Sequence, residues 1–207
     1  MTSIGKLIHR YAGRLLGGGD RALHDWVLAQ LDIRPDDAIL EIGCGPDAAM
    51  KRILKAHKGV FVVGVDASAD AVGEAWRKNA RAVRAGRAML VQTDITRGLP
   101  AFAAPFARVV AVNAPLPDDR AADIFKAARA AMAPGGKLAV AARPPEKEAS
   151  EAYVRLLGKE IRRQLEAAGF ATVRLHEKTF GSSAAVCVTG VNPSPTAKGK
   201  PGGHRQK

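Results

Sequence analysis

Short apolar runs alternate with amphipathic stretches along most of the chain. Runs of this kind, bounded by Gly, Asp or Asn, are typical of strands buried on both faces of a parallel sheet. We expect five such strands, near residues 38–42, 60–65, 88–92, 108–112 and 137–141. Most are followed by a helix-length segment, so the pattern predicts an α/β fold with right-handed crossovers between parallel strands.

Helical periodicity fills the segments between these runs. Apolar residues recur at three- and four-residue spacing in the segments 47–57, 69–85, 118–132 and 146–168. In the long helix 146–168, the expected inner positions are Tyr153, Leu156, Leu157, Ile161 and Leu165. The turn 133–136 separates a helix from the fifth strand. Two final strands, near 169–175 and 184–191, have no helix between them, which predicts an antiparallel hairpin at the sheet edge.

Two further amphipathic helices are expected ahead of the first strand, over residues 3–16 and 20–32. The first helix is basic, whereas the second carries no basic excess. Each has one apolar stripe and nothing else in residues 1–31 to bury it. We therefore expect residues 1–31 to cover the functional site. Attachment of the basic helix to a membrane surface is the alternative.

The stretch Ala38–Ala48 combines an apolar run, two close glycines and a return to helical periodicity. Gly43 and Gly45 remove side chains at a sharp turn, so a ligand can approach the backbone N–H groups that begin the next helix. Glu41 stands at the carboxyl end of the strand, where open α/β sheets bind ligands. The pattern indicates a cofactor loop, although a purely structural turn would use the same glycines.

The spacing Glu41-Ile42-Gly43-Cys44-Gly45 resembles motif I of the class I S-adenosylmethionine-dependent methyltransferases. Asp47 stands where that family has a third glycine; it would cap the next helix or place a carboxylate near the methionine end of the cofactor. The loop also fits the dinucleotide fingerprint, with Ala48 last and Asp66 about twenty residues on. In the methyltransferases, an acid at the position of Asp66 accepts both ribose hydroxyls. A cap on the helix that follows is a second possible role, which is compatible with the first.

A second acidic position favours the methyltransferase over the dinucleotide enzyme. In the family, an acid at the position of Asp94 accepts the adenine amino group, and the next backbone N–H, here that of Ile95, meets the ring. Asn113 weakly resembles the first residue of the Asn-Pro-Pro-aromatic motif of amine-methylating enzymes, and would orient the cofactor or substrate unless it only forms a turn. The resemblance covers about residues 20–190. It implies a Rossmann-like sheet of seven strands with helices on both faces, and S-adenosyl-L-methionine as cofactor.

Composition and charge limit the remaining possibilities. The chain has 207 residues and 47% hydrophobic content, which suits one domain. It contains no apolar run of membrane-spanning length. Cys44 and Cys187 are expected to be buried thiols, so a reducing cytoplasm is the expected location. The net charge of +12 favours anionic partners. Part of it lies in residues 192–207, expected to be a disordered basic tail.

Another part of the charge lies on the helix 69–85 and just after it, as Arg77, Lys78, Arg81, Arg84 and Arg87. Such a run most often forms a solvated helix face, and contact with nucleic acid is the more specific alternative. Trp76 is the only aromatic residue in this segment, so no base-stacking platform is evident. Nucleic acid is therefore a disfavoured partner.

The resemblance implies methyl transfer from S-adenosylmethionine by direct displacement. We expect a small-molecule nucleophile, and the positive surface suggests an anionic substrate. Such chemistry requires positioning and exclusion of water, and needs no metal. His24, on the second helix, and Tyr11, on the first, are the candidates for a base, and Asn113 is a third catalytic candidate. An RNA or protein methyltransferase that uses the basic helix and tail is the alternative. A non-catalytic homologue that binds the cofactor is the third hypothesis.

Overall fold

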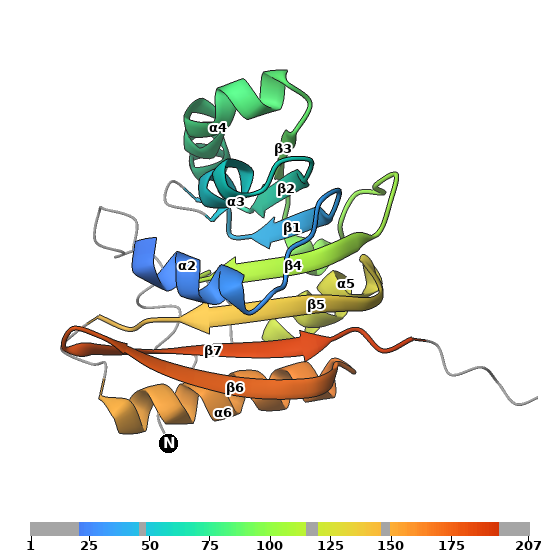
Figure 1. The fold of residues 1–207 in the computed structure, drawn as a ribbon. Coiled ribbons are helices and arrows are strands. Elements are labelled where there is room, and N and C mark those ends of the chain that lie inside the picture. Colours follow the sequence, from blue (N-terminus) through green and yellow to red (C-terminus); the bar gives the residue numbers. More distant parts are fainter. Residues whose placement is uncertain (1–20, 46–48, 115–119, 146–149, 195–207) are drawn as a thin grey trace, which may run out of the picture.

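The computed structural model describes residues 21–45, 49–114, 120–145 and 150–194. Its strands form one seven-stranded sheet in the order β3-β2-β1-β4-β5-β7-β6 (Figure 1). Strands β1 to β5 pair in parallel, and β7 pairs antiparallel with both β5 and β6. This is the predicted fold class. The strands are β1 (Ala38–Ile42), β2 (Phe61–Asp66), β3 (Ala88–Gln92), β4 (Phe106–Val112), β5 (Met132–Ala142), β6 (Ala171–Phe180) and β7 (Ser183–Val191).

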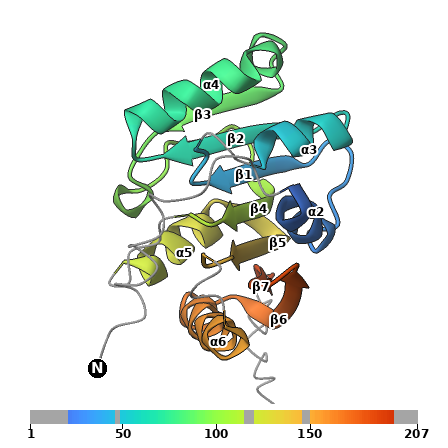
Figure 2. The same ribbon diagram turned by 90° about the vertical axis from the view of Figure 1, so that its left-hand side faces the viewer.

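Helices cover both faces of the sheet, as expected. Figure 2 shows α2 and α3 on one side and α5 and α6 on the other. Alternate strand residues face opposite sides, so Leu40 and Val63 join one core cluster while Ile39 and Val62 join the other. The described helices are α2 (Arg21–Ala29), α3 (Met50–Ala56), α4 (Ala69–Arg84), the short 3₁₀ helix η1 (Ile95–Arg97), α5 (Ala121–Ala130) and α6 (Glu151–Ala167).

Three local expectations need correction. The turn expected at 133–136 lies inside β5, where the pairing with β4 shifts register between Phe106 and Arg108. Strand β6 continues to Phe180 instead of ending near Leu175, because an edge strand keeps pairing on one side even where its sequence is polar. Leu156, expected on the inner face of α6, is 50% exposed.

Helix α2 is built into the domain. Its residues Leu23, Val27 and Leu28 are buried in the same cluster as Ile39 of β1 and Ile53 of α3. Asp25 of α2 also forms an ion pair with Arg52 of α3. The described part of the expected cover, residues 21–31, is therefore a layer on the face of the sheet, and residues 1–20 lie outside the described residues.

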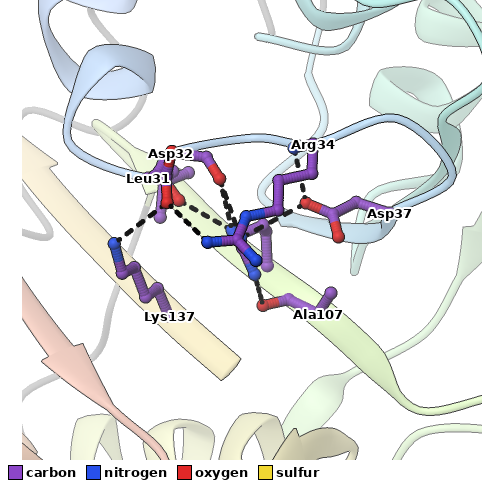
Figure 3. Close-up of polar contacts among 7 residues, drawn as sticks. Leu31, Asp32, Arg34, Asp37, Ala107 and Lys137 are labelled. Atoms are coloured by element: carbon purple, nitrogen blue, oxygen red, sulfur yellow. Dashed lines mark hydrogen bonds and ion pairs between the residues drawn. The ribbon is translucent and has the colours of Figure 1, made fainter. Parts of the chain in front are cut away.

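Arg108, near the start of β4, ties this layer to the sheet; its partners Leu31, Asp32, Asp37 and Ala107 are labelled in Figure 3. Its side chain is buried, and Nε and Nη2 donate hydrogen bonds of 2.7 Å to the carbonyl oxygens of Leu31 and Asp32, respectively. Nη1 donates to the Ala107 carbonyl, and Nη2 lies 3.5 Å from Oδ2 of Asp37. A guanidinium has five N–H donors, and those on Nε and Nη2 meet the chain that leaves α2.

The end of β7 is anchored beyond the expected boundary. Asn192, assigned above to the basic tail, is buried, and its side-chain Nδ2 donates to the carbonyl oxygen of Met132 at 3.0 Å. Its backbone N–H and C=O bond to Gly136 and Gly135. Residues 195–207 lie outside the described residues. No helix of the described chain is long and apolar enough to span a bilayer.

Candidate functional site

The carboxyl ends of the five parallel strands share one edge of the sheet, on the left in Figure 1. The predicted cofactor residues in the described chain lie at or just beyond these strand ends: Glu41, Gly43, Gly45, Asp66, Asp94, Ile95 and Asn113. Tertiary structure thus gathers at one edge residues that are far apart in the sequence. Asp47 and Tyr11, also singled out, lie outside the described residues.

Glu41 is fully enclosed beneath the glycine loop. Its carboxylate accepts hydrogen bonds from the backbone N–H of Ala49 and, at 2.9 Å, from that of Met50. Burial raises the pKa of Glu41 to about 7, although these two N–H groups oppose the increase. Because both donors belong to the start of α3, Glu41 fixes the helix terminus on which the loop ends.

The glycine loop is pinned to β2 on one side and open on the other. Gly43 has a positive φ of 76°, and the N–H groups of Gly43 and Cys44 both donate to the Val65 carbonyl. Among the residues that the structure describes, a Cβ added at Gly45 would meet nothing within 4 Å. Space therefore remains beside the backbone at Gly45, as a bound ligand requires.

Gly64 is a site residue that the sequence analysis missed. A Cβ at this position of β2 would lie 2.7 Å from Cβ of Cys44 and 2.9 Å from Cε of Met50. The available signal was a glycine inside a valine-rich strand, which often marks a close approach. Burial raises the pKa of the Cys44 thiol to about 12, with Glu41 and Asp66 adding to the increase, so Cys44 is a packing residue.

Asp66 ends β2 with a half-buried carboxylate. Its Oδ1 accepts the backbone N–H of Ser68 at 2.9 Å, and the Ser68 hydroxyl in turn accepts from Ala71 N. Ser68 is thus the N-cap of α4, so the expectation that Asp66 caps this helix is wrong, and its expected role toward the ligand is unaffected. Among the described residues, Oδ2 of Asp66 has no hydrogen-bond partner, so it retains capacity to accept hydroxyl groups.

Asp94 lies beside Asp66, because β3 pairs with β2 and Thr93 N donates to the Asp66 carbonyl. Its Oδ1 accepts the backbone N–H and the hydroxyl of Thr96, at 3.0 and 2.6 Å. Its Oδ2 lies 3.2 Å from Nη1 of Arg120, which precedes α5. The bonds from Thr96 chiefly, with a smaller contribution from Arg120, hold the pKa of Asp94 below its usual value. The next residue, Ile95, is buried.

Asn113 holds the ends of β4 and β5 together. Its φ is 49°, its N–H donates to the Ala141 carbonyl, and its Oδ1 accepts the backbone N–H of Arg143 at 2.8 Å. The turn-forming role considered above is therefore present. Orientation of a ligand by its remaining amide N–H groups stays a prediction.

A cationic and aromatic cluster at the same edge was not predicted. The guanidinium of Arg143 lies 5.4 Å from the ring centre of Phe180, and Nζ of Lys178 lies 5.3 Å from it. Trp26 of α2 contacts the same ring edge-on at 5.7 Å. We call Trp26, Arg143, Lys178 and Phe180 the Phe180 cluster. Its members come from three distant segments, and no local pattern marked them.

The remaining candidates are placed as follows. His24 is 6% exposed on the face of α2 that packs against the sheet, and its role as a base stays a prediction. Arg87, counted above in the basic run, donates instead to the carbonyl oxygens of Leu54 and His57. Lys78 pairs with Glu74. No group of three or more metal-ligating side chains is found among the residues that the structure describes.

Comparison with known proteins gives the family. Residues 39–136 match a family described as a methyltransferase domain. YdaC of Bacillus subtilis (strain 168), an uncharacterized methyltransferase, is 32% identical over 185 residues, which are 88% of this chain and 98% of YdaC.

Two solved structures share the fold at low identity. The [4+2]-cyclase SpnF is 15% identical, with a TM-score of 0.67 over 83% of this chain and 81% of SpnF. Phosphoethanolamine N-methyltransferase 2 of Haemonchus contortus, solved with S-adenosyl-L-methionine, is 13% identical, with a TM-score of 0.66 over 91% of this chain and 56% of that protein.

The sequence relative spans nearly the whole of both chains, and the matched domain contains the glycine loop, Asp66, Asp94 and Asn113. The sheet order and the antiparallel edge agree with the predicted fold. The chain therefore belongs to the class I S-adenosylmethionine-dependent methyltransferase family.

Proposed function

We propose that this methyltransferase acts on a small molecule that carries a negative charge, at the edge formed by the ends of β4, β5 and β6. The observation that supports this substrate class is the Phe180 cluster, in which Arg143 and Lys178 place two cations over one aromatic ring. Cations beside an aromatic surface can receive a carboxylate or phosphate while the ring contacts apolar parts of the same molecule.

The residues at the strand ends fit the cofactor. We assign the methionine end to the loop of Gly43 and Gly45, where a Cβ at Gly45 would find open space among the described residues. Asp66 would accept the ribose hydroxyls through Oδ2, and Asp94 would accept the adenine amino group beside the buried Ile95. The bound cofactor supplies an electrophilic methyl group on a positively charged sulfur.

The protein's own contribution is positioning. Asn113 joins β4 to β5 and holds the backbone of Arg143, so it couples the cofactor edge to the Phe180 cluster. Trp26 and Phe180 present apolar surface that would exclude water from a bound substrate. Residues 1–20 precede α2, whose first turn lies at this edge in Figure 1, and we propose that they complete the cover.

The cofactor assignment is tested by calorimetry with S-adenosylhomocysteine. Replacing Asp66 with Ala should remove charge-assisted contacts and weaken binding by roughly 1.5–3 kcal/mol. Asp70→Ala, in the first turn of α4, is the matched control and should leave the affinity unchanged. Tight binding of NADH with no heat from S-adenosylhomocysteine would overturn the assignment.

The substrate class is tested by offering total RNA and a small-molecule extract in parallel, at low and high salt. The alternative, RNA methylation, is favoured by exposed Arg77, Arg81 and Arg84 on α4. Binding through phosphates would fall log-linearly with salt. We expect methyl incorporation into the extract, unchanged when the chain ends at Ser194, and lost with Arg143→Ala. If methyl groups are instead incorporated into RNA, in a reaction that is sensitive to salt and requires residues 195–207, the alternative is correct and our proposal is wrong.

A further inference from the structure

We propose that Arg120 occupies the adenine-binding oxygen of Asp94 in the cofactor-free chain and releases it when the cofactor enters. By this competition, Arg120 lowers the affinity for the cofactor. This inference rests on the proposed function, which assigns the adenine amino group to Asp94.

The argument begins with the capacity of the Asp94 carboxylate. A carboxylate oxygen has about two lone pairs for hydrogen bonds. Oδ1 already accepts two donors from Thr96, its backbone N–H at 3.0 Å and its hydroxyl at 2.6 Å. An adenine amino group must therefore bind at Oδ2.

Arg120 is already at that oxygen. Its Nη1 lies 3.2 Å from Oδ2 of Asp94 and 3.2 Å from the hydroxyl of Thr96, so the guanidinium bridges the two side chains. Arg97 is the next cation, with Nε 3.9 Å from the same Oδ2. A flat base that donates its amino group to Oδ2 would enter the space that the Arg120 guanidinium fills.

The ion pair is weak enough to exchange. The side chains of Arg120 and Asp94 are 49% and 32% exposed, and exposed pairs contribute little because water and salt screen them. The guanidinium can turn into solvent, whereas the bonds from Thr96 hold the carboxylate in place. Because the pair must break before the adenine binds, the competition makes the binding free energy of the cofactor less favourable by the free energy of this ion pair.

Two consequences can be measured with S-adenosylhomocysteine, which has no net charge at neutral pH. Replacing Arg120 with Ala should strengthen binding by about two- to five-fold, the range that an exposed pair allows. Added salt should strengthen binding to the wild-type chain, because it weakens the competing ion pair, and should leave the Arg120→Ala variant unchanged. The salt response has the opposite sign to that of a charge that attracts the ligand.

The experiment is calorimetry on the full chain, with thermal melts to show that each variant is folded. Arg97→Ala is the matched control and should change the affinity by less than about 1.5-fold, because its cation lies farther from Oδ2. Asp94→Asn should weaken binding at least about tenfold, since it removes the charged acceptor.

The outcomes separate this inference from the proposed function. Absence of S-adenosylhomocysteine binding to the wild-type chain would contradict the cofactor assignment itself. If Asp94→Asn leaves binding intact, the adenine does not bind to Asp94, and this inference is wrong. Binding that depends on Asp94 but is unchanged or weakened by Arg120→Ala would overturn the inference alone.

Discussion

The amino and carboxyl edges of the sheet both carry charged clusters, but they use charge in different ways. At the amino edge, the buried Arg108 is enclosed by the carbonyl oxygens of Leu31, Asp32 and Ala107 and by the carboxylate of Asp37. At the carboxyl edge, Oδ2 of Asp66 keeps a free acceptor among the described residues, and the backbone at Gly45 borders open space. One edge stabilises the fold, and the other retains the capacity to bind.

The difference lies in whether protein groups satisfy the charge. A buried guanidinium without its partners would be costly, so Arg108 holds the chain after α2 in one position. Carboxylates at a strand end keep solvent on one side and can exchange water for a ligand. Charge alone therefore does not indicate a binding site.

The largest expected effect comes from breaking the amino edge. Arg108→Met should reduce the free energy of unfolding by about 3–5 kcal/mol, since it removes the ion pair of Asp37 and the side-chain donor to the carbonyl groups of Leu31, Asp32 and Ala107. Urea denaturation measures this loss. Cofactor affinity of the folded variant should be unchanged. The exposed Arg34→Ala should cost less than about 0.5 kcal/mol; equal losses for the two variants would remove the special role of Arg108.

The next effect concerns the buried carboxyl under the glycine loop. The pKa of Glu41 is about 7 in the folded chain, against an ordinary value of 4.5. Between these pH values the folded chain binds a proton that the unfolded chain does not, so the free energy of unfolding falls as pH rises through this window.

Glu41→Gln should remove this pH dependence, which amounts to roughly 3 kcal/mol across the window. Urea unfolding of both chains from pH 4 to about 8 measures the difference. Parallel curves for the wild-type chain and the variant would show that Glu41 stays ionised in the folded state.

The smallest expected effects concern two glycines near the carboxyl edge. Gly64→Ala should destabilise the chain by about 1–3 kcal/mol, because the added Cβ meets Cys44 and Met50. Gly45→Ala should change stability by less than about 0.5 kcal/mol, yet weaken cofactor binding about tenfold, because its Cβ enters the space left for the ligand. Denaturation and calorimetry on both variants test this; unchanged cofactor affinity in Gly45→Ala would place the ligand elsewhere.

The gathering of the glycine loop and the acidic residues at the carboxyl edge was predictable because its signals are local. A strand, two glycines and a helix are encoded within Ala38–Ala56, and an acid directly after a strand must lie at the carboxyl edge. The Phe180 cluster was not predictable, since Trp26, Arg143 and Phe180 are separated by long stretches of chain and none has a marked local pattern. Gly64 was visible as an unusual residue, but its neighbours Cys44 and Met50 were not.

The sequence by itself determined the succession of strands and helices and the antiparallel edge, because periodicity and turn residues act over a few neighbouring residues. The cofactor class followed from the resemblance of its motifs to a known family. Only the tertiary structure decided which cations are structural and which face the site. Arg87 and Arg108 donate to main-chain carbonyls, Arg120 pairs with Asp94, and Arg143 lies over Phe180. The physical reason is that an arginine's role depends on the acceptors it meets, and chain segments far apart in sequence supply those acceptors.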